Sequence, residues 1–252
     1  MTVIEHAADY SAAVAAGRAT AHTDPLTYFV DDESSQALFL GYSVAALRLK
    51  AQLAQAAIRV DRNHPLFVYL PCGVGGAPGG ITFGLKHVFG DAVHCFFAEP
   101  VQAPCMLLAF LSGFSPPPSV ATIGLGINTA ADGLAVGRAS RLVGLLVQKL
   151  VSGIFTIDDD SLFRFLQALY RTECIRIEPS AAAGFAGPFC LCKSAAGHNW
   201  LDTSGSASCL DAATHVIWTT GGRLLPDKEF AAMVARGEHA ALALPETGHA
   251  DQ

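Results

Sequence analysis

The chain has 252 residues, of which 51% are hydrophobic and 15% charged, with a formal net charge of -6. This balance excludes a disordered chain and suffices for one large domain or part of a two-domain unit. Lys and Arg form no runs, which excludes electrostatic binding to nucleic acid or to an anionic membrane. No apolar stretch is long enough to span a bilayer and no signal peptide is visible, so we expect a cytoplasmic protein.

The first 64 residues have a mainly helical pattern. We expect an alanine-rich helix over residues 7–21, a short strand at 28–30 and a long helix over 42–58. The polar stretch 61–64 is then expected to cross over between two bodies. Because the chain opens in a helix without a preceding strand, we also expect that an upstream segment belongs to the same folding unit.

From Pro65 onward, short β-rich runs alternate with helical runs, which is typical of a parallel α/β sheet. Strands are expected at residues 66–70, 93–98, 155–157, 175–177 and 215–219. Helices are expected at residues 78–89, 103–111 and 137–150, then after an N-cap at Asp158, and finally from Pro226. Residues 194–208 are rich in Gly and Ser and are expected to form a loop.

The seven cysteines do not suggest a metal site. Cys190 and Cys192 are one residue apart, and no second ligand pair stands nearby. Three others lie in apolar runs, where a buried free thiol is the ordinary interpretation.

The strongest local feature is the glycine-rich stretch PCGVGGAPGG at residues 71–80, which follows a strand and opens a helix. Glycines let the backbone approach an anion closely, and free N–H groups at a helix start can bind a phosphate. The spacing is neither that of a dinucleotide fingerprint nor that of a P-loop with its lysine. The stretch therefore indicates a cradle for the phosphate of a smaller ligand, or else a tight turn that packs a helix against the sheet.

Six motifs follow one another along the chain: FLGYSVA (39–45), FVYLPCGVGG (67–76), HCFFAEP (94–100), TAADGLAVGR (129–138), EPSA (178–181) and WTTGG (218–222). In order and spacing they are similar to those of D-serine dehydratases. These enzymes are fold type II pyridoxal 5′-phosphate (PLP) enzymes, as are threonine dehydratase and serine racemase. The resemblance implies an α/β fold with a parallel sheet flanked by helices. Residues 1–64 would end a small domain and cross over, and residues 65–252 would form the C-terminal part of the large PLP-binding domain.

The resemblance also assigns cofactor-binding positions. The loop that holds the PLP phosphate through main-chain N–H groups matches Gly73, Val74, Gly75, Gly76 and Ala77. Ala77 stands where a glycine is usual. Thr220 matches the residue whose hydroxyl meets the pyridine nitrogen. The segment Glu178-Pro179-Ser180 has the pattern of a strand end followed by a helix cap, and we assign it a role in the pocket wall only.

Five further positions match those that hold a monovalent cation such as K⁺ in related enzymes, largely through carbonyl oxygens. They are Glu99, Ala103, Cys105, Leu134 and Val136. Such an ion would be hard and oxygen-ligated. From the residues alone, Glu99 is equally well an exposed carboxylate at a strand end.

The lysine that forms the Schiff base in this family lies within a Ser-x-Lys-x-Arg-Gly type of motif, and none of the five lysines here has that context. We therefore assign no catalytic residue to this chain. We expect that the lysine, and an asparagine for the ring oxygen, lie in a missing N-terminal half.

The complete enzyme is expected to convert D-serine to pyruvate and ammonia by α,β-elimination, while this chain alone is expected to be inactive. Two alternatives stay open: a non-catalytic module that binds PLP or phosphate, and one half of a split dehydratase whose partner chain supplies the lysine. The motifs do not distinguish D-serine from D-threonine as the substrate.

Overall fold

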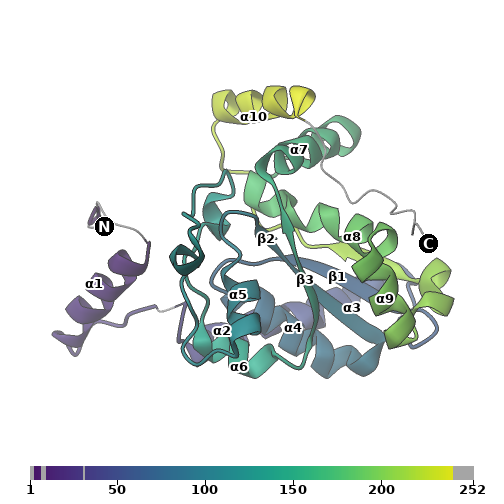
Figure 1. The fold of residues 1–252 in the computed structure, drawn as a ribbon, viewed down its shortest axis with the longest axis horizontal. Coiled ribbons are helices and arrows are strands. Elements are labelled where there is room, and N and C mark those ends of the chain that lie inside the picture. The colour runs from purple at the N-terminus through teal and green to yellow at the C-terminus, as the bar shows by residue number, and fades with distance from the viewer. Residues whose placement is uncertain (1–2, 7–9, 31, 241–252) are drawn as a thin grey trace.

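The computed structural model describes residues 3–6, 10–30 and 32–240, and it is built around a parallel β-sheet (Figure 1). The sheet has four strands in the order β3-β2-β1-β4, and each neighbouring pair is parallel. The strands are β1 (Leu66–Pro71), β2 (Val93–Pro100), β3 (Val151–Ile157) and β4 (Thr214–Ile217). The predicted α/β fold with a parallel sheet flanked by helices is confirmed.

One face of the sheet carries the largest hydrophobic core. Leu66, Val68 and Leu70 of the central strand β1 point into it, since alternate residues of a strand share a face. The helices that contribute to this core are α2 (Gln36–Ser43), α3 (Ala45–Gln55), α4 (Gly76–Phe89), α5 (Cys105–Ser112) and α6 (Arg141–Val147). Helix α4 follows β1 directly, so its first turn lies at the carboxyl end of the sheet.

The opposite face is covered by the C-terminal third of the chain. Phe67 and Tyr69 of β1 point to this side and pack with Leu191 and Leu201. The covering helices are α8 (Gly187–Lys193) and α9 (Ala195–Ser204), preceded by a 3-10 helix at Pro179–Ala186. Helices α7 (Asp159–Glu173) and α10 (Asp227–His239) pack against each other outside this layer (Figure 1).

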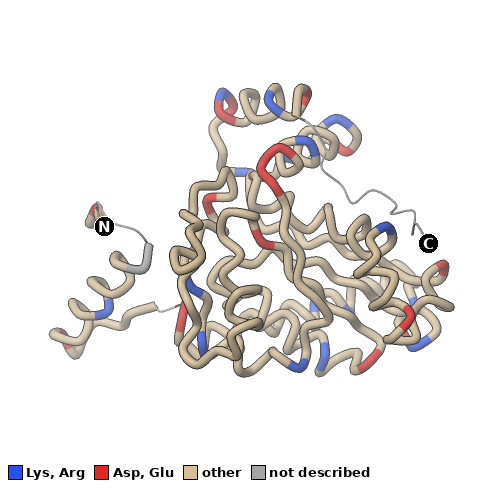
Figure 2. Tube along the Cα trace, viewed as in Figure 1, with Lys and Arg blue, Asp and Glu red and all other residues tan. Residues whose placement is uncertain are grey.

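Helix α1 (Tyr10–His22) lies away from the body of the protein (Figure 1). It confirms the predicted alanine-rich helix from Tyr10 onward, whereas residues 7–9 lie outside the described residues. Arg18 of α1 forms an ion pair with Glu33 at 3.0 Å. Along the described trace, Lys and Arg are interspersed with Asp and Glu (Figure 2), as the absence of basic runs in the sequence predicts.

Four expected elements differ from the structure. Residues 28–30 form no strand, because Tyr28 and Val30 are exposed and pair with no neighbouring strand. Residues 175–177 likewise form no ladder with the sheet. The helix expected over 42–58 is divided at Val44, whose N–H donates to the carbonyl of Gly41 at the end of α2. Residues 194–208 contain helix α9, because Ser194 caps its N-terminus through the N–H of Gly197.

Candidate cofactor site

The glycine-rich loop leaves β1 at the carboxyl edge of the sheet and enters α4. The N–H of Cys72 continues the sheet ladder by donating to Ala98 at 2.9 Å. Gly75 has φ +108°, a left-handed conformation that a side chain would strain, and it is the N-cap of α4 without any capping side chain. Ala77, in place of the usual glycine, lies within the first turn of α4 and has no positive φ, so the alanine fits there.

The loop presents free hydrogen-bond donors. Within the described part of the chain, the main-chain N–H groups of residues 73–77 donate to no other residue. A helix N-terminus carries a partial positive charge as well as unpaired N–H groups, and both favour an anion. The loop therefore has the local chemistry of a phosphate cradle.

These donors line a cavity of about 260 Å³. The residues around it are Asp32, Tyr42, Pro71, Gly73, Val74, Gly75, Gly76, Ala77, Pro78, Gly133, Leu134, Glu178, Ser180 and Thr220. All six predicted cofactor-binding residues are thus brought together around one cavity. The free N–H groups of the loop fit a phosphate group. Glycine at position 73 lets the loop pack closely on residues 133–136, because a Cβ atom there would fall 3.1 Å from the carbonyl oxygen of Gly133.

The far wall of the cavity comes from two segments that are distant in sequence. Thr220 follows β4 and is exposed at the cavity. The N–H of Glu178 donates to the carbonyl of Gly221 at 3.1 Å, which holds the two segments side by side. Ser180 is buried and accepts the N–H of Gly133 at 3.0 Å. The prediction that Glu178 belongs to the pocket wall is confirmed.

Sequence reasoning did not assign Asp32, Tyr42 or Gly133 to the cavity. Asp32 and Tyr42 come from the segment around α2, which lies more than 30 positions before the loop. Tyr42 is part of the FLGYSVA motif, but that motif by itself indicates no ligand. Gly133 lies in the TAADGLAVGR motif, in which only Leu134 and Val136 were assigned, and these to the cation. Asp32 and Glu178 are the two acidic residues of the described lining, and no Lys or Arg belongs to it.

The five residues predicted to hold a cation come from two segments: residues 99–105, between the end of β2 and the start of α5, and residues 134–136. Glu99 is fully buried at the end of β2, so the alternative of an exposed carboxylate is wrong. Its two oxygens accept the N–H groups of Met106 and Leu107 at 2.7 and 2.8 Å, in the first turn of α5. Burial raises the pKa of Glu99 to about 7, although these hydrogen bonds oppose the rise.

Gly73 is a common neighbour of Cys105, Leu134 and Val136 among the predicted cation residues. The Cys105 thiol donates to the carbonyl oxygen of Gly73 at 3.3 Å. A Cβ atom at Gly73 would lie 3.3 Å from Leu134 Cα and 3.4 Å from Val136 Cγ2. The carbonyl of Ala103 accepts the N–H of Cys105, and that of Leu134 accepts the N–H of Val136. Each of these oxygens keeps a second lone pair, so the donors fit a hard cation.

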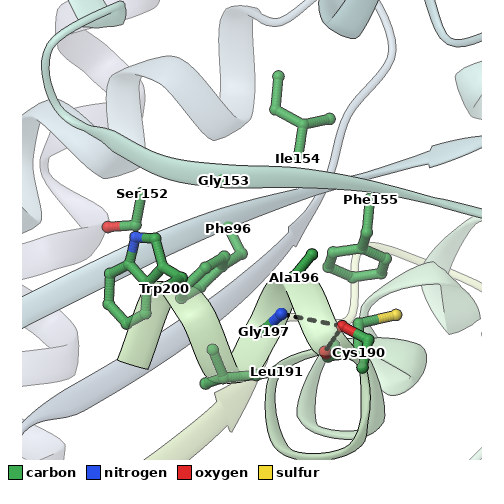
Figure 3. A pocket seen from close by; sticks show the side chains of 12 residues that line it. Phe96, Ser152, Gly153, Ile154, Phe155, Cys190, Leu191, Ala196, Gly197 and Trp200 are labelled. Atoms are coloured by element: carbon green, nitrogen blue, oxygen red, sulfur yellow. Dashed lines mark hydrogen bonds between the residues drawn. The ribbon is translucent and has the colours of Figure 1, made fainter. Parts of the chain in front are cut away.

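A second cavity of about 200 Å³ lies on the other face of the sheet, between β3 and the helices α8 and α9 (Figure 3). The aromatic residues that line it are Phe96, Phe155 and Trp200 (Figure 3). None of the predicted cofactor or cation residues lines this cavity. It is therefore separate from the candidate cofactor site.

All five lysines of the chain lie in the described ranges, and none lines the cofactor cavity. Lys86 is on α4 but points to its other end, where Nζ donates to the carbonyl of Val93 at 2.6 Å. In the same ranges, no group of three His, Cys, Asp or Glu side chains is placed to hold a metal ion. No helix among the described residues has the length and apolar character needed to cross a membrane.

A family model described as "Pyridoxal-phosphate dependent enzyme" matches residues 1–200. This match spans most of the chain and includes the glycine-rich loop and the cation residues. The chain therefore belongs to the family of pyridoxal-phosphate dependent enzymes, and pyridoxal phosphate is the cofactor of that family.

Curated relatives give a narrower comparison. The chain is 57% identical over 237 residues to a probable D-serine dehydratase of Halalkalibacterium halodurans, covering 94% of this chain and 53% of the relative. It is 52% identical over 237 residues to the D-serine dehydratase of Salmonella arizonae, with the same coverage of 94% and 53%. The chain thus spans about half the length of the curated relatives it matches.

Solved structures support the fold. The chain superimposes on diaminopropionate ammonia lyase from Escherichia coli with a TM-score of 0.69 at 19% identity, covering 92% of this chain and 58% of that one. For serine racemase from Dictyostelium discoideum the TM-score is 0.53 at 22% identity, with coverage of 75% and 50%. At these identities the comparison identifies a fold type II arrangement and nothing finer.

Proposed function

We propose that this chain is the C-terminal part of a PLP-dependent D-serine dehydratase, which converts D-serine to pyruvate and ammonia. The observation that carries the proposal is the row of free N–H groups at residues 73–77, which line one cavity together with Thr220. The identities of 52–57% to D-serine dehydratases support the choice of substrate. Residues 1–64 would end the small domain, and residues 65–252 would belong to the large domain.

The residues of this chain would bind and orient the cofactor. Main-chain N–H groups of Gly73 to Ala77 would hold its phosphate, assisted by the partial positive charge at the start of α4. The Thr220 hydroxyl would meet the pyridine nitrogen and, being neutral, would not favour its protonation. When bound, pyridoxal phosphate supplies an electron sink for the substrate carbon that loses its proton.

The residues around the cavity indicate that a basic group must come from outside this chain. The described lining includes the acidic residues Asp32 and Glu178 and no Lys or Arg, yet the cavity would bind an anionic phosphate. None of the five lysines of the chain reaches it. We infer that an N-terminal half supplies the lysine and an asparagine for the ring oxygen. The curated relatives are long enough to contain such a half, because this chain covers only 53% of the first of them.

Complementation tests this proposal directly. The chain would be co-expressed with the N-terminal half of a related D-serine dehydratase, and pyruvate formation from D-serine and from D-threonine would be measured. We expect pyruvate from D-serine only when both halves are present, and no activity when Gly75→Asp adds like charge at the phosphate cradle. Rescued activity that is indifferent to Gly75→Asp would contradict the proposed phosphate site.

The lack of a lysine in the cavity favours one alternative, a non-catalytic module that binds PLP without turnover. Borohydride reduction after addition of PLP, followed by peptide mapping, distinguishes the possibilities for this chain. We expect no stoichiometric pyridoxyl-lysine on the isolated chain. A single fully modified lysine in this chain would show that it carries its own cofactor lysine.

We also propose that a monovalent cation such as K⁺ binds at the carboxylate of Glu99 and the carbonyls of Ala103, Cys105, Leu134 and Val136. The buried carboxylate supports this proposal, because a cation would offset the cost of its charge. We expect K⁺ to raise the melting temperature more than tetramethylammonium at equal ionic strength. Glu99→Gln should abolish that difference, and an equal response to both cations in the wild type would contradict the site.

A further inference from the structure

Helix α2 lies in backbone contact with the phosphate-loop helix α4. A Cβ atom added to Gly80 of α4 would overlap with the carbonyl oxygen of Phe39 and fall 2.7 Å from Tyr42 Cβ. One turn further along α4, a Cβ atom at Gly84 would overlap with the carbonyl oxygen of Ser43. Glycines at both positions therefore let α2 approach α4 closely, and they fix the position of Tyr42 over Gly80.

The side chain of Tyr42 extends from Gly80 toward the start of α4. Its Cβ is beside Gly80, yet Tyr42 also lines the cavity that is bounded by Gly76 and Ala77. Gly80 and Gly76 are one helical turn apart, about 5.4 Å, and a tyrosine side chain spans about that length beyond its Cβ. The length of the side chain therefore allows the hydroxyl of Tyr42 to reach the cavity.

The hydroxyl of Tyr42 is available to a ligand. Within the described residues it makes no hydrogen bond, and the residue is 38% exposed. Of the other hydroxyls at the cavity, that of Ser180 lies on the far wall, where it accepts the N–H of Gly133, and that of Thr220 is assigned to the pyridine nitrogen. Tyr42 thus brings a free O–H donor to the end of the cavity where the loop N–H groups are found.

We propose that Tyr42 binds the phosphate of the cofactor by donating a hydrogen bond from its phenolic hydroxyl. This inference rests on the proposed function, because it assumes that the phosphate occupies the loop of residues 73–77. The role explains why α2, which is remote from the loop in sequence, is held so closely against α4. A hydroxyl donor also partly compensates for the absence of a basic side chain around the cavity.

The test separates the phosphate contribution to binding from that of the ring. Pyridoxamine 5′-phosphate and pyridoxamine are suitable probes, because neither carries an aldehyde that reacts with surface lysines. Their dissociation constants would be measured by fluorescence for the wild-type chain, Tyr42→Phe and Tyr170→Phe. Tyr170 is a matched control, since it is 37% exposed but lies on α7 against Phe230, away from the cavity.

We expect Tyr42→Phe to weaken binding of the phosphorylated probe by about tenfold or more, as for a hydrogen bond to a charged group. Binding of pyridoxamine should not change, and Tyr170→Phe should bind both probes as the wild type does. If the wild type prefers the phosphorylated probe and Tyr42→Phe keeps that preference, the role of Tyr42 is overturned while the phosphate loop stands. If the wild type shows no preference, both proposals fail.

Discussion

The thiol of Cys105 donates to the carbonyl oxygen of Gly73 at 3.3 Å, so the first residue of α5 contacts the start of the glycine-rich loop. Cys105, Cys72 and Cys95 are all fully buried, and burial raises the pKa of each thiol, that of Cys95 to about 12. Because the thiolate is the reactive form, these three thiols should be inert in the folded chain.

Thiol titration checks this expectation. With Ellman's reagent, the exposed Cys174 should react first, and Cys72, Cys95 and Cys105 should react only after unfolding in denaturant. Mass mapping of partially modified protein identifies the order. Modification of Cys105 as fast as Cys174 would show that α5 does not pack on the loop as described.

His94 should make stability dependent on pH. It stacks on Phe67, and burial lowers the pKa of His94 to about 4, from an ordinary value of 6.5. Between pH 4 and 6.5, His94 binds a proton in the unfolded chain but stays neutral in the folded chain. The free energy of unfolding should therefore fall as the pH drops from 6.5 to 4, and the full contribution of His94 should be present above pH 6.5.

Urea unfolding of wild type and His94→Gln across this range measures the effect. The comparison is needed because Glu99, whose pKa is raised, has the opposite effect between pH 4.5 and 7. We expect the variant to lose less stability than the wild type on acidification, and His87→Gln, at an exposed position of α4, to behave like the wild type. Parallel curves for wild type and His94→Gln would refute the assignment.

The contact between α2 and α4 should be sensitive to a single methyl group. Gly80→Ala would place its Cβ against the main chain at Phe39 and against Tyr42, and backbone atoms cannot rotate away. We expect a loss of about 1–3 kcal/mol of unfolding free energy, as for overpacking in a core. Gly41→Ala is the control, because a Cβ there meets nothing within 4 Å and should stabilise α2 slightly. Equal stability of the two variants would mean that the helices are not in close contact.

The sequence predicts the sheet and the loop well because both depend on local patterns. The continuous apolar run at residues 66–70 indicates a buried strand, and the glycines that follow it indicate a tight approach to a helix. Asp158 as an N-cap is confirmed by its bond to the N–H of Ser161 at 2.9 Å. These elements follow from the residues within one or two turns of the chain.

The remaining features depend on contacts between distant segments. Residues 28–30 and 175–177 have strand-like composition, but a strand exists only where a partner strand is available to pair with it. Ser194 and Gly205 flank α9 as its caps, whereas their composition indicated a loop. Tyr42 reaches the cavity only through the packing of α2 on Gly80, which no pattern near Tyr42 reveals. The division into a small domain, ending at residue 64, and a large domain from residue 65 stays a prediction.

The central claim is that the loop of residues 73–77 binds the cofactor phosphate, and it is tested most directly by adding a charge to this loop. Gly75→Ala and Gly75→Asp both place a side chain at φ +108° and against Met106, but only the aspartate adds charge. Gly90→Asp, at φ +57° with open space around it, is a control for a charged residue in a strained turn elsewhere. Circular dichroism would establish that each variant is folded.

The measurement is the ratio of the dissociation constants for pyridoxamine and pyridoxamine 5′-phosphate in each variant. We predict a large ratio for the wild type and Gly90→Asp, a reduced ratio for Gly75→Ala and a ratio near one for Gly75→Asp, because a carboxylate at the loop repels the phosphate. A folded Gly75→Asp that keeps the wild-type ratio would contradict the account, since the phosphate would then bind elsewhere.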